Sequence, residues 1–514
     1  MPKSIMIQGT GSSVGKSVIN AGLCRIFLQD GLRVCPFKAQ NMSLNSFVTS
    51  EGLEMGRAQV TQAAACRIAP QADMNPVLIK PTSDVGSQII VQGRPIGNRT
   101  ARQYQNKEYK EKLFSKIKDS FQRLSKVHDL MVMEGAGSPA EVNLQKHDIV
   151  NMKMAQYANS PVILVGDIDK GGVFAALVGT LQLLGQKDQQ RIKGFVINKF
   201  RGDKTLLKKG IDFLERKTKK PVLGVIPYFK DIRIAEEDSV VLETTAEPGK
   251  PGTKKTSTID IAVIKLPHIS NFTDFDALTN DPDVDLNYIS HASRLNHPDV
   301  IIIPGTKNTI KDLLWLKQSG LASAILSAMD YRTCLSGRQA LTILIGICGG
   351  YQMLGRKIHD AHGIESRQKE ISGLGVLPIT TFLEKSKALS QVRAEEISTG
   401  LEIFGYEIHH GRSQKLKNHH PVFRIISRYG KSVKDFDGTS ALNGNIWGTY
   451  IHGVFDADNF RNSFLNRIRK EKGLLALDRQ ENFDLDKELD KLASLLRQNI
   501  DLKQLYKIIK NRNV

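Results

Sequence analysis

Short apolar runs of strand length alternate with longer amphipathic stretches along most of the chain. The runs in the first half are 5–8, 130–133, 161–165, 194–198 and 222–226, and those in the second half are 259–266, 300–303, 341–347, 373–379 and 446–450. Continuous runs of Val, Ile and Leu separated by helical segments are typical of parallel sheets that have helices on both faces. The pattern therefore predicts the α/β class.

The alternation is interrupted once, and the interruption divides the chain. Residues 246–258 read AEPGKPGTKKTST, a stretch without apolar periodicity that is typical of a linker. We expect two doubly wound domains on either side of it, at residues 1–245 and 259–460. Leucines then recur at helical spacing between residues 485 and 505. This spacing predicts a helical extension at 461–514 that packs through one apolar face.

Composition excludes several classes of protein. The longest apolar runs are far shorter than the ~20 residues that a membrane-spanning helix needs, and the N-terminus leads directly into a strand without room for a signal peptide. The five cysteines show no CxxC pairing and are too sparse for a disulfide framework, which indicates a reducing compartment. We expect a cytoplasmic protein that is neither secreted nor inserted in a membrane.

The charge balance indicates anionic ligands. Lys and Arg total 72 against 53 Asp and Glu, a net charge of +19. Such an excess suits nucleic acid as well as small anionic substrates. The sequence has no zinc-finger spacing, no RNA-binding aromatic motif and no uninterrupted basic block. We therefore expect small anionic ligands and no nucleic acid.

A glycine-rich loop follows the first apolar run. Residues 9–17 read GTGSSVGKS and lead into a helical stretch, an order that places backbone N–H groups and a helix N-terminus around a phosphate. The fit to GxxxxGK[ST] is imperfect, because Thr10 stands where the first glycine belongs. A plain tight turn is the alternative. The residues predicted to bind ATP phosphates are Thr10, Gly15, Lys16 and Ser17, and the Ser17 hydroxyl is also a predicted Mg²⁺ ligand.

This loop resembles those of dethiobiotin synthetase and related ATP-dependent ligases that activate carboxylates. Three further residues match that group, each at the end of a predicted strand, where open α/β sheets bind ligands. The resemblance implies that Lys38 faces the transferred phosphate, that Glu134 helps to hold Mg²⁺, and that Asn198 meets adenine. The alternatives are a solvated ion pair between Lys38 and Glu134, and a helix cap at Asn198.

A cysteine between an apolar strand and a helix marks a second site. Residues 341–355 read LTILIGICGGYQMLG. The small residues around Cys348 permit the strained turn that exposes a nucleophile and directs backbone N–H groups at an oxyanion. Cys24 and Cys66 lie on helical stretches instead, which is typical of core cysteines. We therefore predict that Cys348 is a nucleophile.

A nucleophilic cysteine needs a base, and His452 in GTYIHGVF is the candidate. The predicted oxyanion donors are the backbone N–H groups of Gly305 and Gly349. The rival bases are His409 and His410. Adjacent residues on a strand face opposite ways, so at most one of this pair can point into a site.

GICGGYQMLG together with GTYIHGVF resembles the triad-type glutamine amidotransferase domain, which has a flavodoxin-like fold. Joined to a P-loop-like ATP-binding half similar to dethiobiotin synthetase, it resembles the cobyrinate amidase family. Within that family, residues 36–46, 54–59, 167–174 and 199–203 are similar to those of cobyric acid synthases. The usual amidotransferase pattern has Glu two residues after the histidine, where this chain has Val454. We therefore predict only a Cys348–His452 dyad, with Glu407 as a candidate for the carboxylate that orients the histidine.

The resemblance implies an ATP-dependent ligase that uses glutamine as its nitrogen donor and Mg²⁺ with ATP. The carboxylates b, d, e and g of adenosylcobyrinic acid a,c-diamide would be phosphorylated and then amidated, and the corrinoid cobalt would belong to the substrate. Two alternatives remain: the same architecture acting on another substrate, such as cobyrinate or a cell-wall lipid, and a regulatory or partitioning ATPase. Cys348 and His452 argue against the ATPase. The sequence leaves a homo-oligomer open.

Overall fold

The computed structural model describes residues 2–83, 86–229, 231–234, 258–330, 342–477 and 483–511. The chain forms two compact units, and each is considered by itself. The first comprises residues 1–43, 54–240 and 484–514, and the second comprises residues 44–53 and 241–483. Each unit contains a six-stranded sheet that is wholly or mainly parallel, which confirms the predicted α/β class.

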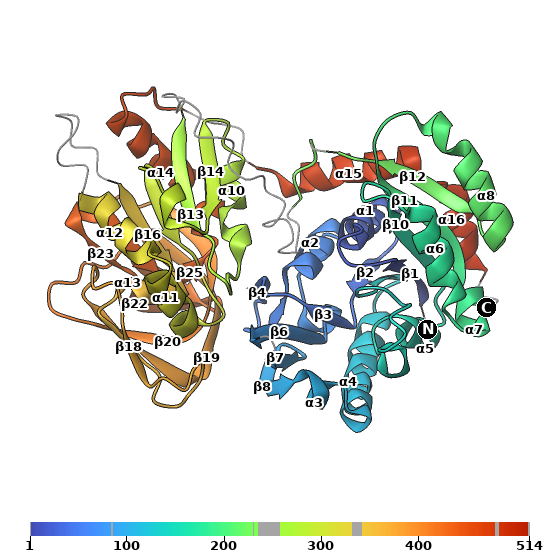
Figure 1. The fold of residues 1–514 in the computed structure, drawn as a ribbon, viewed down its shortest axis with the longest axis horizontal. Helices are drawn as coiled ribbons and strands as arrows, with labels where there is room; N and C mark the ends of the chain where they lie inside the picture. Colours follow the sequence, from blue (N-terminus) through green and yellow to red (C-terminus); the bar gives the residue numbers. More distant parts are fainter. Residues whose placement is uncertain are drawn as a thin grey trace. The chain divides into compact units, whose positions relative to one another are not determined.

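The sheet of the first unit is wholly parallel, with the strand order β12-β11-β10-β1-β9-β2 (Figure 1). Its strands are β1 (Lys3–Gly9), β2 (Val34–Phe37), β9 (Leu130–Glu134), β10 (Val162–Asp167), β11 (Ile192–Phe200) and β12 (Val222–Pro227). Every apolar run predicted in this half falls on one of these strands. Their carboxyl ends lie at one edge of the sheet, because parallel strands all point the same way.

Helices cover both faces of this sheet because successive side chains of a strand point to opposite faces. Ile5 and Ile7 enter the core beneath α1, whereas Met6 enters the core beneath α4 and α6. The helices of the first unit are α1 (Lys16–Gln29), α2 (Arg57–Ala65), α3 (Ala101–Tyr104), α4 (Lys107–Ser125), α5 (Met152–Tyr157), α6 (Val173–Gln182), α7 (Gln186–Arg191), α8 (Lys208–Thr218), α15 (Leu485–Asn499) and α16 (Leu502–Lys510).

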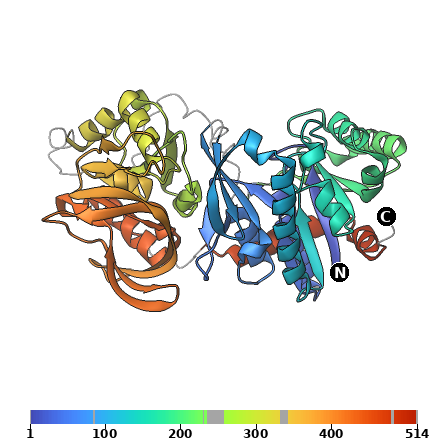
Figure 2. The same cartoon turned by 90° about the horizontal axis from the view of Figure 1, so that it is seen from below.

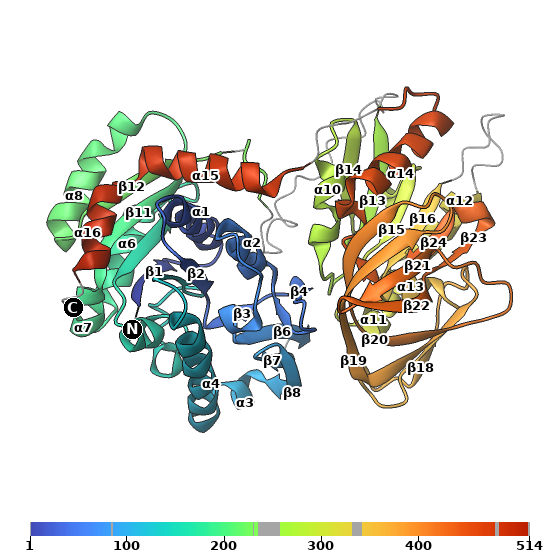
Figure 3. The same cartoon turned by 180° about the vertical axis from the view of Figure 1, so that it is seen from behind.

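The last two helices pack on the first one. Figure 3 shows α15 next to α1, and their apolar side chains share one buried core. A Cβ atom added to Gly22 of α1 would lie 2.4 Å from Leu496 of α15, so the close approach requires glycine. The predicted apolar face of residues 485–505 is thus buried against the N-terminal helix.

A smaller sheet completes the first unit, with the order β3-β6-β7-β8. Its strands are β3 (Gln40–Met42), β6 (Val77–Ser83), β7 (Gly86–Val91) and β8 (Arg94–Thr100), and the short β5 (Glu54–Gly56) precedes α2. β3 and β6 are parallel, and the other pairs are antiparallel.

The second unit has a sheet of order β14-β13-β15-β16-β24-β23, in which only β23 runs antiparallel to its neighbour. Its strands are β13 (Ile259–Ile264), β14 (Val284–Ile289), β15 (Val300–Ile303), β16 (Ile343–Ile347), β23 (Thr439–Ala441) and β24 (Ile446–Thr449). The helices are α10 (Asp276–Thr279), α11 (Thr309–Gln318), α12 (Leu321–Asp330), α13 (Gly349–Leu354) and α14 (Asp458–Glu471).

A second sheet of this unit is built around two long antiparallel strands, β19 (Ile379–Glu396) and β20 (Glu402–Lys415), drawn in orange in Figure 2. The remaining strands are β17 (Lys357–His359), β18 (Glu370–Ser372), β21 (Phe423–Arg428), β22 (Lys431–Asp437) and β25 (Ile451–His452). β25 pairs with β20, which brings His452 opposite Tyr406.

The structure differs from the sequence-based expectations in three places. The predicted extension is divided, because α14 packs in the second unit whereas α15 and α16 pack in the first. Residues 44–53 belong to the second unit although their neighbours in sequence belong to the first. Residues 373–378 form no strand, because the backbone N–H groups of Leu374 and Val376 bond to the end of α13. The predicted linker at 246–258 lies outside the described residues apart from its last one.

Candidate active sites

The phosphate loop connects β1 to α1 at the carboxyl edge of the first sheet. Gly15 stands immediately before α1 with φ of +93°, a backbone conformation that glycine adopts without strain. Asn198, a buried residue of β11, donates from Nδ2 to the Val14 carbonyl at 2.9 Å. A Cβ atom on Gly15 would lie 2.1 Å from that amide nitrogen. Asn198 therefore holds the loop shape directly, in addition to the adenine contact that the resemblance implies.

The Lys16 ammonium group bonds to backbone carbonyls of this loop and of a neighbouring turn. Its Nζ donates to the Gly11 carbonyl at 2.6 Å and to the Gly137 carbonyl at 3.3 Å. Thr10 is fixed by its backbone N–H, which donates to the Val165 carbonyl at 2.9 Å. The ammonium group is thus held among backbone carbonyls, next to the first turn of α1, where helix N–H groups favour anions.

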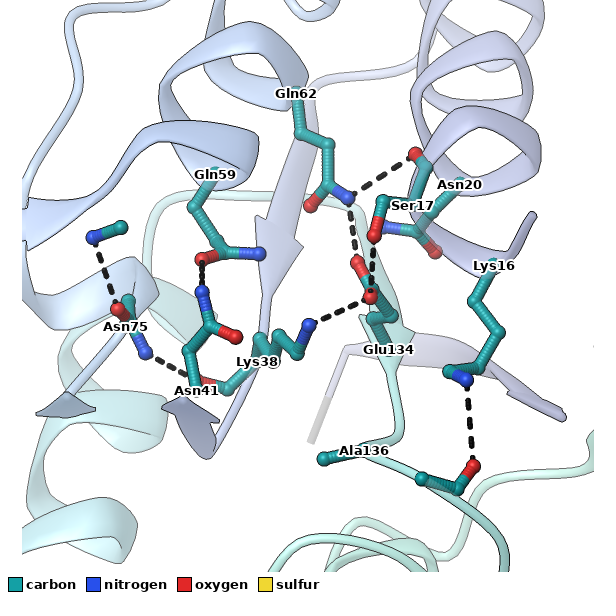
Figure 4. Close-up of polar contacts among 12 residues, drawn as sticks. Lys16, Ser17, Asn20, Lys38, Asn41, Gln59, Gln62, Asn75, Glu134 and Ala136 are labelled. Carbon is teal, nitrogen blue, oxygen red and sulfur yellow. Dashed lines mark hydrogen bonds and ion pairs between the residues drawn. The ribbon is translucent and has the colours of Figure 1, made fainter. Parts of the chain in front are cut away.

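Glu134 lies at the centre of the polar contacts around the loop (Figure 4). Its Oε1 accepts hydrogen bonds from Ser17 Oγ and Lys38 Nζ, both at 2.8 Å, and its Oε2 accepts one from Gln62 Nε2 at 2.6 Å. Burial raises the pKa of Glu134, but the Lys38 ammonium and the three hydrogen bonds outweigh it and hold the pKa below its usual value. Lys38 and Glu134 form a buried ion pair, not the solvated one considered as an alternative.

The donor set around Glu134 fits a magnesium ion. A carboxylate and a hydroxyl oxygen are hard ligands of the kind that Mg²⁺ prefers, and this ion usually keeps several waters and phosphate oxygens. Within the described residues, no three His, Cys, Asp or Glu side chains cluster as a complete protein cage. Ser17 and Glu134 are therefore suited to a metal that arrives with a nucleotide.

Gln62 was not predicted from the sequence. It is fully buried on α2, and its Nε2 also donates to the Ser17 carbonyl at 3.2 Å. The amide orientation is fixed, because only its N–H₂ end can bond to a charged Glu134 carboxylate. Its Oε1 has no hydrogen-bond partner among the described residues. A glutamine in a helix carries no local signal of such a contact, since Glu134 lies 72 residues further along the chain.

Cys348 occupies a strained turn between β16 and α13 in the second unit. Its φ is 52° and its ψ is −104°, values that a non-glycine residue rarely adopts. The adjacent glycines permit this turn. A Cβ atom on Gly350 would lie 1.9 Å from the Ile303 carbonyl oxygen, and one on Gly346 would lie 2.7 Å from the backbone of Tyr351. The backbone at Cys348 therefore forms the strained turn that the sequence predicted.

His452 is held by Asp274. The two side chains bond through His452 Nδ1 and Asp274 Oδ2 at 2.6 Å, and the backbone N–H of Gly453 donates to Asp274 Oδ1 at 3.1 Å. Burial lowers the pKa of His452, but Asp274 and, to a smaller extent, Cys348 raise it to about 10. His452 is therefore protonated at neutral pH and has the cysteine among its neighbours.

The suggested role of Glu407 is wrong. Its carboxylate forms a two-point ion pair with Arg428, at 2.8 and 2.9 Å. The carboxylate beside His452 comes from Asp274, in the 3₁₀ turn Phe272–Phe275, which lies 178 residues earlier in the chain. Val454, at the position where the usual pattern has Glu, is buried in the core.

The two predicted oxyanion glycines lie beside these groups. Gly305 follows β15, and a Cβ atom there would lie 3.0 Å from His452 Cε1. Gly349 is the first residue of α13, where the backbone N–H has no partner within the helix. A Cβ atom on Gly349 would lie 2.7 Å from Thr306 Cγ2, so the two turns are in contact.

The rival histidines have other roles. His409 donates from Nδ1 to the Gly411 carbonyl at 2.7 Å, and its ring stacks on Tyr450 with centroids 3.8 Å apart. Burial lowers the pKa of His409 to about 4, so the ring is neutral. The Nδ1 atom of His410 bonds to the Glu384 carbonyl at 3.1 Å. The ring of His452, by contrast, is bonded to Asp274.

A cavity of about 400 Å³ opens next to His409 and Tyr450. Both signs of charge line it, from Glu384, Lys387, Arg412, Arg428 and Asp435. Burial and the nearby Glu407 raise the pKa of Asp437, which also lines the cavity, to about 6. The Nε2 atom of His409, another lining residue, is buried and has no partner within the described residues.

Together the fold and the two sites define a nucleotide-binding protein that carries a glutamine amidotransferase domain. Residues 5–241 match the CobQ/CobB/MinD/ParA nucleotide binding domain, and residues 260–460 match the CobB/CobQ-like glutamine amidotransferase domain. Among the described residues, no helix is long and apolar enough to cross a membrane.

Similarity extends over nearly the whole chain. Cobyric acid synthase from Clostridium botulinum (strain Loch Maree / Type A3) is 51% identical over 509 residues, covering 98% of this chain and 99% of that relative. The Moorella thermoacetica cobyric acid synthase is 49% identical over 520 residues, with 99% and 98% covered. The chain therefore belongs to the cobyric acid synthase family, ligases of cobalamin biosynthesis.

Proposed function

We propose that this protein amidates peripheral carboxylates of adenosylcobyrinic acid a,c-diamide in two linked chemical steps. The first unit activates a carboxylate with ATP, and the second unit releases ammonia from glutamine. The observation that carries the proposal is the grouping of Cys348, His452 and Asp274 in a unit that lacks the phosphate loop.

The first step needs activation because a carboxylate is a poor electrophile. An attack of a carboxylate oxygen on the γ-phosphorus of ATP gives an acyl phosphate and ADP, and ammonia then displaces phosphate to form the amide. Lys16 and the N–H groups at the start of α1 would neutralise phosphate charge, and Ser17 and Glu134 would hold Mg²⁺. The bound Mg²⁺ would stabilise charge on the transferred phosphoryl group. Lys38 lies next to Glu134 and is suited to hold the transferred phosphate.

The second step hydrolyses glutamine through a thioester. The Cys348 sulfur attacks the side-chain amide carbon, and the N–H groups of Gly305 and Gly349 stabilise the oxyanion. His452 donates its proton to the departing nitrogen, which leaves as ammonia. Asp274 fixes the orientation and raises the pKa of the ring, so that the acid form is present at neutral pH. Water then hydrolyses the thioester to glutamate.

The cavity beside His409 suits the other end of glutamine. An amino acid carries an ammonium and a carboxylate on the same carbon, so its recognition needs both signs of charge. Lys387 and Arg412 can hold the carboxylate, and Glu384 can hold the ammonium. Arg428, by contrast, is already paired with Glu407 and Asp435. The four described cysteines are free, which agrees with a reducing cytoplasm.

The substrate is tested by counting amidations. The purified chain is incubated with ATP, glutamine and candidate corrinoids, and the products are analysed by mass spectrometry. Each amidation replaces a hydroxyl with an amino group and shifts the mass by a fixed step. We expect four successive steps on the a,c-diamide, at carboxylates b, d, e and g. Amidation of cobyrinate itself, with no reaction of the a,c-diamide, would assign the chain to another substrate.

A further inference from the structure

Residues 44–53 pack in the amidotransferase unit although they lie in the nucleotide-binding half of the sequence. The preceding strand β3 and the following strand β5 both belong to the first unit, so the chain leaves that unit after residue 43 and returns at residue 54. The segment is deeply embedded, since Asn45, Ser46, Val48 and Thr49 are all buried. We refer to residues 44–53 as the crossing segment.

The crossing segment fixes one side chain that touches the catalytic histidine. The Ser46 backbone N–H donates to Asn271 Oδ1 at 3.0 Å, and Asn45 Oδ1 accepts from the Phe272 backbone N–H at 3.1 Å. A backbone N–H can only donate, so the Asn271 amide must present its oxygen to Ser46. Its Nδ2 therefore faces His452, at 3.4 Å from both ring nitrogens.

A second contact reaches the same ring through aromatic side chains. The Phe47 ring lies 5.3 Å from that of Tyr406, and Tyr406 stacks on His452 with centroids 5.2 Å apart and an interplanar angle of 17°. Val48 packs in the same small cluster, and its carbonyl accepts from Gln391 Nε2 at 3.1 Å. Both Asn271 and Tyr406 thus contact His452, and the crossing segment contacts both of them.

We propose that the crossing segment positions His452 and is the route by which the synthetase half controls glutamine hydrolysis. This inference rests on the proposed glutaminase role of His452. The segment continues directly from β3, which begins two residues after Lys38, so a shift of this strand when substrate binds is transmitted along the backbone. Asn271 and Tyr406 are positioning residues, because each acts through the histidine ring. Ammonia release would then be coupled to the presence of a carboxylate to be amidated.

Phe47→Ala in the full chain tests this proposal, with Phe404→Ala as its control. Phe404 is an exposed aromatic residue on β20, the strand that also carries Tyr406. Ammonia release from glutamine is measured with and without MgATP and the corrinoid a,c-diamide. We expect Phe47→Ala to lower kcat in the presence of both ligands by ~10- to 100-fold, since a catalytic group displaced by about 1 Å can cost two orders of magnitude. The KM for glutamine should not change.

Three further measurements complete the test. Phe47→Leu should restore most of the rate, and amidation driven by ammonium salts should survive in every variant. Asn45→Ala removes the hydrogen bond to the Phe272 backbone N–H without opening an aromatic cluster. It should reduce the stimulation of glutamine hydrolysis by MgATP and corrinoid. The proposal is overturned if Phe47→Ala behaves like Phe404→Ala, or if the stimulation persists in full in both variants. A failure of the proposed glutaminase role would be seen in a different variant: Cys348→Ser would then still release ammonia from glutamine.

Discussion

A single long-range contact, from Asp274, orients His452. Asp274 bonds to the ring nitrogen and to the next backbone N–H, so it sets both the orientation and the protonation of the imidazole. The sequence indicated the cysteine and the histidine, because the small residues around each are local patterns. It could not indicate Asp274, because the contact spans 178 residues and the 3₁₀ turn that presents it has no distinctive spacing.

Asp274→Asn tests this contact at the residue scale. Asp274 contributes to raising the pKa of His452 to about 10, so its removal lowers that pKa. The acid form of the ring is then lost at lower pH, and the alkaline limb of glutamine hydrolysis moves from near pH 10 towards neutral pH. At neutral pH we expect the rate to fall by ~10²-fold or more, within the span of a general acid. Asp285→Asn, at an exposed carboxylate of the same unit, should leave the pH profile unchanged; an equal shift in both variants would contradict the assignment.

Strands and turns could be predicted where the sequence pattern that specifies them lies within a single element. The apolar runs predicted most strands of the two main sheets but not β14 or β23. The small residues of GTGSSVGKS and GICGG predicted the two strand-to-helix turns. The apolar run at residues 373–378 was wrongly predicted as a strand. These residues pack against the end of α13, and their backbone N–H groups bond to it. The leucines of 485–505 indicated a buried face, but the identity of its partner, α1, depends on tertiary structure.

The docking of α15 on α1 leads to a prediction at the element scale. Leu492 is fully buried against Gly22, where a Cβ atom would lie 3.0 Å from the leucine Cγ. Leu492→Ala should lower the free energy of unfolding of the first unit by about 2–5 kcal/mol, the usual cost of such a cavity. Denaturant titration of the full chain measures this value. Leu206→Ala is the matched control, because that side chain also lies in the first unit and is 81% exposed. A shift no larger than that of the control would mean that the C-terminal helices contribute little to stability.

At the scale of the whole molecule, the sequence order and the structural units do not coincide. The chain enters the second unit at residues 44–53 and returns to the first at residue 54. It enters the second unit again at residue 241 and returns to the first at residue 484, where α15 and α16 follow. Composition and periodicity predicted two domains separated by a linker. They could not predict these exchanges, because an embedded segment or a returning helix looks the same in sequence whichever unit it packs in.

The central claim is that carboxylate activation and ammonia release are separate activities of one chain. Cys348→Ser tests it most directly, with corrinoid products counted by mass spectrometry after reaction with ATP and either glutamine or an ammonium salt. We predict amidated products from ammonium and none from glutamine, because the substitution removes only the nucleophile of the second unit. Lys16→Ala should give no product from either source. If a folded Cys348→Ser variant amidates with glutamine, or fails with ammonium as well, the two activities are not divided between the sites described.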